Sequence, residues 1–128
     1  MPKKPEPVEL VLCEGLHFDV QAGKMSLVGV FNSRRFVSFP TPIQQFTVYA
    51  GLQGGEGQGT MRLTVSQADT EADLYQFESW RGFSDPDLIV MYEGIVRKVV
   101  FPEAGRYIVT LRFDGEIVAD RILDVFQE

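Results

Sequence analysis

The feature that most constrains the fold is a two-residue alternation of apolar and polar side chains, broken at short intervals by Gly, Pro and Asp. The stretches Phe46–Leu52 and Tyr107–Phe113 show this alternation most clearly. A period of two places successive side chains on opposite faces of a β-strand. Many short strands separated by turn residues are typical of a sandwich or a barrel. The sequence therefore predicts an all-β fold.

The pattern predicts about eight strands. They are Val8–Cys13 with its continuation Leu16–Val20, then Met25–Phe36, Phe46–Leu52, Met61–Val65, Leu74–Trp80, Leu88–Phe101, Tyr107–Phe113 and Ile117–Phe126. Residues 46–52 and 61–65 are expected to form a β-hairpin around the loop Gly54–Gly59. Gly94 suggests a bulge. Thr70–Asp73 could instead open a helix as a capping box, but the aromatic residues that follow favour a strand.

The end of the chain gives the sharpest local predictions. Asp114-Gly115 is a favoured two-residue hairpin turn, because both positions accept positive φ. In the stretch Phe101–Tyr107, Gly105 offers a turn just before Tyr107. Many sandwiches place a buried tyrosine at such a corner, with its hydroxyl bonded to the backbone upstream. We expect Tyr107 to be buried and bonded near residues 102–105, in an antiparallel sandwich that is immunoglobulin-like or a related Greek key.

Most of the chain resembles a bacterial family of small β-sandwich proteins whose function is uncharacterised. The residues that carry the resemblance are Asp19, Gly23-Lys24, Leu27–Phe31, Gly105 with Tyr107, and Asp114-Gly115. The resemblance implies the same fold. It implies no catalytic or binding residue.

Length and charge restrict the classes of function. With 128 residues the chain fits one domain, expected at 8–128 after a flexible N-terminal tail at 1–7. The net charge of −6 disfavours nucleic acid and anionic membrane surfaces as partners. A single cysteine and a single histidine exclude a four-ligand zinc site within one chain and favour a reducing cytoplasm.

Two groups of residues invite a chemical role. Cys13 and His17 could act as nucleophile and base, but an extended chain would separate them by about 13 Å. A second group consists of the carboxylates Asp69, Glu71, Asp73, Asp85 and Asp87. These acids could hold calcium if their two loops met at one end of the sandwich. Solvated turn residues are the commoner state of such acids.

Three further motifs have simpler explanations. Gly55–Gly59 is followed by a strand, whereas a phosphate-binding glycine loop leads into a helix. The aromatic residues Tyr75, Phe77 and Trp80 could stack on a sugar, but alternation places Trp80 on the other face from Tyr75 and Phe77. The basic pairs Arg34-Arg35 and Arg97-Lys98 are split between faces in the same way.

No residue is therefore assigned a catalytic, cofactor-binding or metal-binding role. The predicted function is a non-catalytic cytoplasmic module for binding or assembly. Its partner is expected to be another protein or a second copy of this chain. The alternative is a calcium- or carbohydrate-binding β-sandwich domain. An enzyme with a diffuse carboxylate site is a third, less favoured hypothesis.

Overall fold

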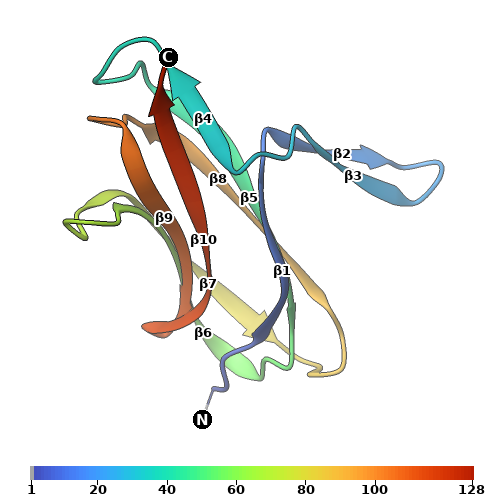
Figure 1. Cartoon of the computed structure of the whole chain (residues 1–128). Helices are drawn as coiled ribbons and strands as arrows, with labels where there is room; N and C mark the ends of the chain where they lie inside the picture. The colour runs from blue at the N-terminus through green and yellow to red at the C-terminus, as the bar shows by residue number, and fades with distance from the viewer. Residues whose placement is uncertain (1) are drawn as a thin grey trace.

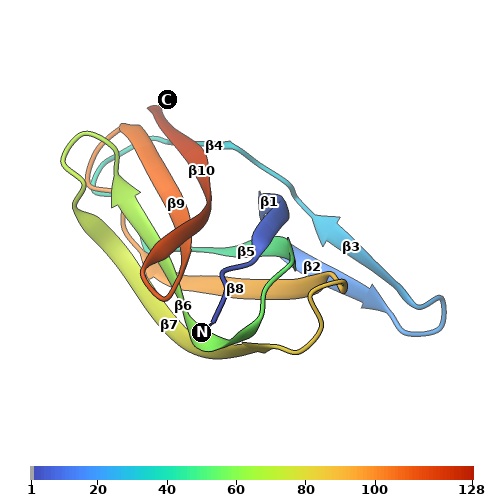
Figure 2. The ribbon, with the colours of Figure 1, turned by 90° about the horizontal axis from the view of Figure 1, so that it is seen from below.

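Two packed β-sheets and a projecting ribbon make up the computed structural model, which describes residues 2–128. The strands are β1 (Glu6–Cys13), β2 (Gly15–Asp19), β3 (Lys24–Val28), β4 (Ser33–Phe36), β5 (Gln44–Gln53), β6 (Gly57–Gln67), β7 (Asp73–Phe83), β8 (Val90–Val99), β9 (Gly105–Phe113) and β10 (Glu116–Gln127). One sheet has the order β1-β5-β8 and the other β4-β10-β9-β6-β7. Strands β2 and β3 pair only with each other. Figure 1 and Figure 2 show the two layers and the ribbon beside them.

The core lies between the two larger sheets and is built by the predicted alternation. In β5, Phe46, Val48, Ala50 and Leu52 are almost completely buried. They meet buried residues of the opposite sheet, namely Met61, Leu63, Val65, Tyr107, Val109, Leu111 and Phe113. A two-residue period places these side chains on the face that meets the other sheet, while Thr47 and Tyr49 on the opposite face of β5 are buried as well. The all-β prediction is confirmed, with ten strands in place of about eight.

The predicted hairpin between residues 46–52 and 61–65 is wrong. Strand β5 pairs with β1 and β8, whereas β6 pairs with β7 and β9. The glycine loop therefore carries the chain from one sheet to the other. Alternation fixes which face of a strand is buried, but it does not fix which neighbour supplies the hydrogen bonds.

The predicted strand Met25–Phe36 is also divided in two. Gly29 adopts a φ of 66°, which ends β3, and the chain then crosses to the other sheet as β4. There β4 runs parallel to β10, with Ser33 opposite Asp124. This pair departs from the predicted antiparallel arrangement. Parallel neighbours require a long connection, and here residues 37–115, which include β5 to β9, separate β4 from β10 along the chain.

Two smaller expectations differ from the structure. The segment predicted to be a loose tail is paired with the domain: Lys3 forms a bridge with Glu56, and β1 begins at Glu6. Gly94 is not a bulge, because it pairs regularly with Val48. The irregularity in β8 lies further along, between Val96 and Val99.

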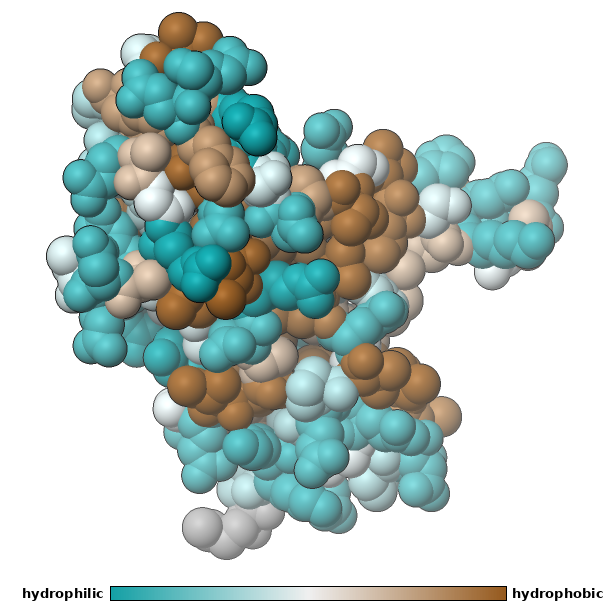
Figure 3. All heavy atoms as spheres, in the orientation of Figure 1, coloured by the Kyte–Doolittle hydropathy of each residue, from teal (hydrophilic) through white to brown (hydrophobic). Residues whose placement is uncertain are grey.

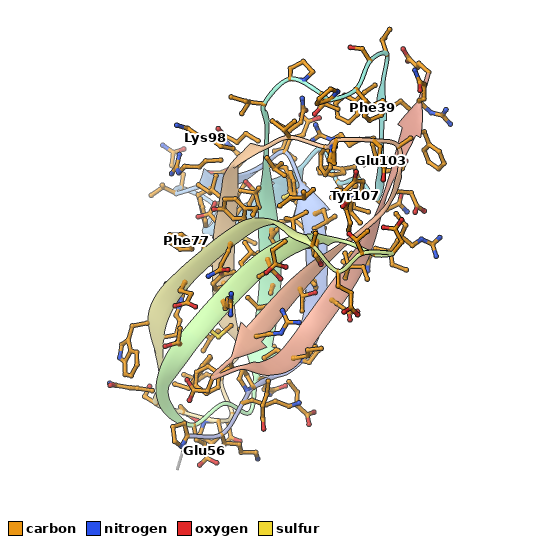
Figure 4. The ribbon with its side chains drawn as sticks, turned by 90° about the vertical axis from the view of Figure 1, so that its left-hand side faces the viewer. Phe39, Glu56, Phe77, Lys98, Glu103 and Tyr107 are labelled. Atoms are coloured by element: carbon orange, nitrogen blue, oxygen red, sulfur yellow. The ribbon has the colours of Figure 1, made fainter. Side chains whose placement is uncertain are left out.

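The corner at Tyr107 is confirmed. The Tyr107 hydroxyl donates a hydrogen bond of 2.6 Å to the carbonyl oxygen of Glu103, and the side chain is 1% exposed. Its ring packs edge-on against Phe101, with centroids 4.8 Å apart. Figure 4 shows Glu103 and Tyr107 close together at this corner. The turn at Asp114-Gly115 has positive φ at both residues, as predicted.

A second core tyrosine, Tyr92, lacks such a partner. Its side chain is 2% exposed, and its buried hydroxyl forms no hydrogen bond with any residue from 2 to 128. Burial raises the pKa of Tyr92 to about 12, although the nearby Arg81 lowers it somewhat. An unpaired buried hydroxyl costs roughly 1–3 kcal/mol, so its removal relieves a penalty.

We predict that Tyr92→Phe leaves the free energy of unfolding unchanged or raises it, as measured by denaturant melts at neutral pH. The raised pKa also predicts that wild type loses stability as pH rises from about 10 to about 12, because only the unfolded tyrosine then ionises. Tyr92→Phe should show a smaller loss over this range. A variant clearly less stable than wild type at neutral pH would show that the hydroxyl has a partner.

Candidate functional site

The feature that stands apart from the body of the molecule is the β2–β3 ribbon. It leaves the end of β1 and returns to β4 without joining either larger sheet. Figure 1 and Figure 2 show it projecting to one side, and Figure 3 shows a narrow arm with a hydrophilic tip. An isolated two-stranded ribbon is only marginally stable in water. The projection therefore calls for a physical explanation.

The pairing of the two strands gives the ribbon one apolar face. Leu16 lies opposite Leu27, and Phe18 lies opposite Met25. Residues paired across a ladder point to the same side, and every second pair shares a face. The other face carries His17 opposite Ser26, and the ribbon's end carries Asp19 opposite Lys24.

This apolar face is only partly covered by the rest of the chain. Phe18 is 51% exposed, and Leu16, Met25 and Leu27 are only partly buried. None of the four belongs to the hydrophobic core or to the partly buried residues packed against it. Grouped exposed apolar side chains typically mark a surface that contacts another molecule.

Cys13 and His17 are placed in different environments. Cys13 ends β1 and is completely buried, and this burial raises the pKa of its thiol. His17 is exposed on the projecting ribbon. Among residues 2–128, no hydrogen bond joins the two side chains. A neutral buried thiol is a weak nucleophile. It remains a prediction that neither Cys13 nor His17 takes part in catalysis.

The acidic residues fall into two groups at opposite ends of β7. Asp69, Glu71 and Asp73 lie where β6 turns into β7, whereas Asp85 and Asp87 follow its far end. Eleven residues of strand separate the groups by roughly 35 Å. The two loops therefore cannot supply ligands to one ion. The absence of a specific calcium site stays a prediction, which calorimetry with calcium would test.

The glycine loop is packed against neighbouring side chains. A Cβ atom added to Gly55 would lie 2.8 Å from the Phe83 ring, and one added to Gly59 would lie 2.5 Å from Phe113. These glycines allow the chain to pass closely over the core as it changes sheets. No helix follows the loop, so the arrangement is not that of a dinucleotide-binding turn.

The three aromatic residues do not form one platform. The Tyr75 hydroxyl donates to the carbonyl of Ile95 at 3.1 Å, and the Tyr75 ring packs against the core. Trp80 is 68% exposed, and its indole NH donates to Gln58. Trp80 lies an odd number of residues from both Tyr75 and Phe77, so it faces the other side of β7.

The Arg34-Arg35 pair is split between two environments, whereas Arg97 and Lys98 both lie exposed at the irregularity between the buried Val96 and Val99, contrary to the prediction. The Arg34 guanidinium lies 4.1 Å from the centroid of the Phe31 ring, whereas Arg35 lies over Phe126. Arg97 and Lys98 are exposed neighbours on β8.

The described part of the chain contains no helix long and apolar enough to cross a membrane.

The geometry defines an all-β protein of two packed sheets with a protruding two-stranded arm. The chain belongs to a family of unknown function, DUF6941, whose model matches residues 9–126. No curated protein matches the chain. Among solved structures, it is similar to an immunoglobulin-like protein from Pseudomonas aeruginosa at 11% identity and a TM-score of 0.40. That match covers 92% of this chain and 97% of the other.

Proposed function

We propose that the protein is a non-catalytic binding module of the cytoplasm, and that it recognises a protein partner through the β2–β3 ribbon. The observation that carries this proposal is the partly exposed apolar face formed by Leu16, Phe18, Met25 and Leu27, which does not belong to the core. Burial of a large apolar side chain contributes about 1.5–3 kcal/mol, so four such residues offer a substantial driving force.

The shape of the ribbon suits a contact with another molecule. Because the arm projects from the body, a partner can cover its apolar face without any movement of the core. A partner would also stabilise a ribbon that is marginal by itself. A second copy of the chain is included among the partners, since it would present the same arm.

The cytoplasmic and non-catalytic parts of the proposal rest on residue chemistry. The only cysteine is buried and free, so no disulfide within the chain calls for an oxidising compartment. The net charge of −6 favours solubility and disfavours nucleic acid. The buried thiol and the exposed histidine lack the mutual contact that nucleophilic catalysis requires.

The test uses the full chain in three forms: wild type, Phe18→Ser and Val37→Ser. Val37 is 71% exposed on the body of the protein, between β4 and β5, and serves as the matched control. Sedimentation measures self-association, and affinity capture from the native cell measures other partners. We expect Phe18→Ser to lose the partner, or the self-association, that wild type and Val37→Ser retain.

Both substitutions are on the surface, so denaturant melts should give similar stabilities for the three proteins. Equal retention of the partner by all three forms would place the contact elsewhere. A monomer that captures no protein in any form would overturn the proposal.

A further inference from the structure

Two arginines face each other on the outer side of the five-stranded sheet. Arg62 of β6 lies directly opposite Arg112 of β9 in the antiparallel register. Their neighbours Met61, Leu63, Leu111 and Phe113 are buried in the core, so both arginines point outward. Figure 4 views the molecule from the side on which β6 and β9 run next to each other. Like charges directly opposite in a sheet are destabilising, so this pair needs a compensating group.

The surrounding protein compensates the pair only in part. Arg62 donates from Nη2 to Gln76, and its Nε lies 3.7 Å from a carboxylate oxygen of Glu78. That Nε is nevertheless shielded from solvent and makes no hydrogen bond within residues 2–128. Arg112 donates from Nη1 to the Thr64 hydroxyl at 3.3 Å. Across the same described chain, Arg112 forms no ion pair.

The pair lines a hollow in the sheet surface. The hollow has a volume of about 500 Å³, and its wall also includes the hydroxyls of Ser66 and Thr110. Hydroxyl and guanidinium donors in one hollow are the groups that bind oxyanions. The carboxylates Glu71, Asp73 and Asp120 line the same hollow, so a polyanion such as a polyphosphate would be repelled more strongly than a small single oxyanion.

We propose that Arg62 and Arg112 together bind a single oxyanion, a carboxylate or a phosphate group, in this hollow. The planar guanidinium fork matches both groups and can bind them through two parallel hydrogen bonds. An anion between the arginines removes their mutual repulsion and accepts hydrogen bonds from their guanidinium groups. This site lies on the sheet and is independent of the ribbon and of the proposed protein contact.

The test follows the arginine Nε–H signals of ¹⁵N-labelled protein by NMR during titration with sodium acetate, inorganic phosphate or sodium chloride. We expect acetate or phosphate to shift the signals of Arg62 and Arg112 saturably in the millimolar range, whereas chloride should not. Whichever of acetate and phosphate binds more tightly indicates whether the ligand carries a carboxylate or a phosphate group. Arg112→Gln should weaken binding at Arg62 by about tenfold or more, because a charged hydrogen-bond donor is lost.

Arg97→Gln is the matched control, since Arg97 is exposed on β8 of the other sheet and should leave the affinity unchanged. Shifts that fail to saturate, that chloride reproduces, or that persist in Arg112→Gln would overturn the proposal. Amide spectra report whether each variant is folded. If Arg112→Gln does not fold, the proposal is tested by the wild-type protein alone, through the comparison of acetate and phosphate with chloride.

Discussion

Replacing Tyr107 with alanine is expected to lower the free energy of unfolding by roughly 3–5 kcal/mol, the cost typical of removing a buried aromatic ring. The ring is 1% exposed and packs on Phe101, so its loss leaves a cavity in the core. Tyr107→Phe should cost only about 1 kcal/mol, the net contribution of the hydrogen bond to Glu103. Denaturant melts of the three proteins measure both values.

The control for this series is Trp80→Ala, which removes a larger ring that is 68% exposed. A surface substitution of this kind should change stability by no more than about 0.5 kcal/mol. The interpretation of the corner would be wrong if Tyr107→Ala melted together with Trp80→Ala. If Tyr107→Phe were as stable as wild type, the hydroxyl bond would contribute nothing.

Gly94→Val is expected to destabilise the protein by about 1–3 kcal/mol, through overpacking of the core. Gly94 lies in β8 and faces the opposite sheet, where a Cβ atom would come within 2.7 Å of a methyl group of Leu63. It would also lie 3.0 Å from the Tyr92 ring. Both neighbours are buried and have little room to move.

Thermal and denaturant melts of Gly94→Val and of Gly15→Ala test this prediction. Gly15 has no atom of another residue near its Cβ position, so a methyl group there meets open space. We expect Gly15→Ala to melt close to wild type. Equal midpoints for the two variants would mean that the sheets do not approach each other closely at Gly94.

The sequence by itself was informative wherever the physics is local. Alternation along Phe46–Leu52 and Tyr107–Phe113 correctly predicted which side chains face the core, because neighbours in any strand point to opposite faces. It did not predict that Thr47, Tyr49 and Thr110 on the other faces are buried as well. The turn at Asp114-Gly115 followed from the φ angles that these residues accept. The Tyr107 hydroxyl found its partner at Glu103, four residues upstream, within the loop that the pattern indicated.

Apart from the β9–β10 hairpin at Asp114-Gly115, the sequence pattern did not predict which strands pair. Residues 46–52 and 61–65 were predicted to form a hairpin. A glycine loop between two strands is compatible either with a turn within one sheet or with a crossing between sheets. The same limit explains the parallel pairing of β4 with β10. In each case the choice depends on contacts between residues distant in the chain.

The two proposed sites depend on the same distant contacts. Arg62 and Arg112 are fifty residues apart, and only the β6–β9 register brings them face to face. The residues of the ribbon were predicted to be extended, but their exposure follows from the path of the chain between sheets. Local sequence determined the faces and the turns, since dihedral preference and side-chain period act over a few residues. Tertiary structure decided the partners of strands that no tight turn joins, because burial of one shared core selects among pairings that are locally equivalent.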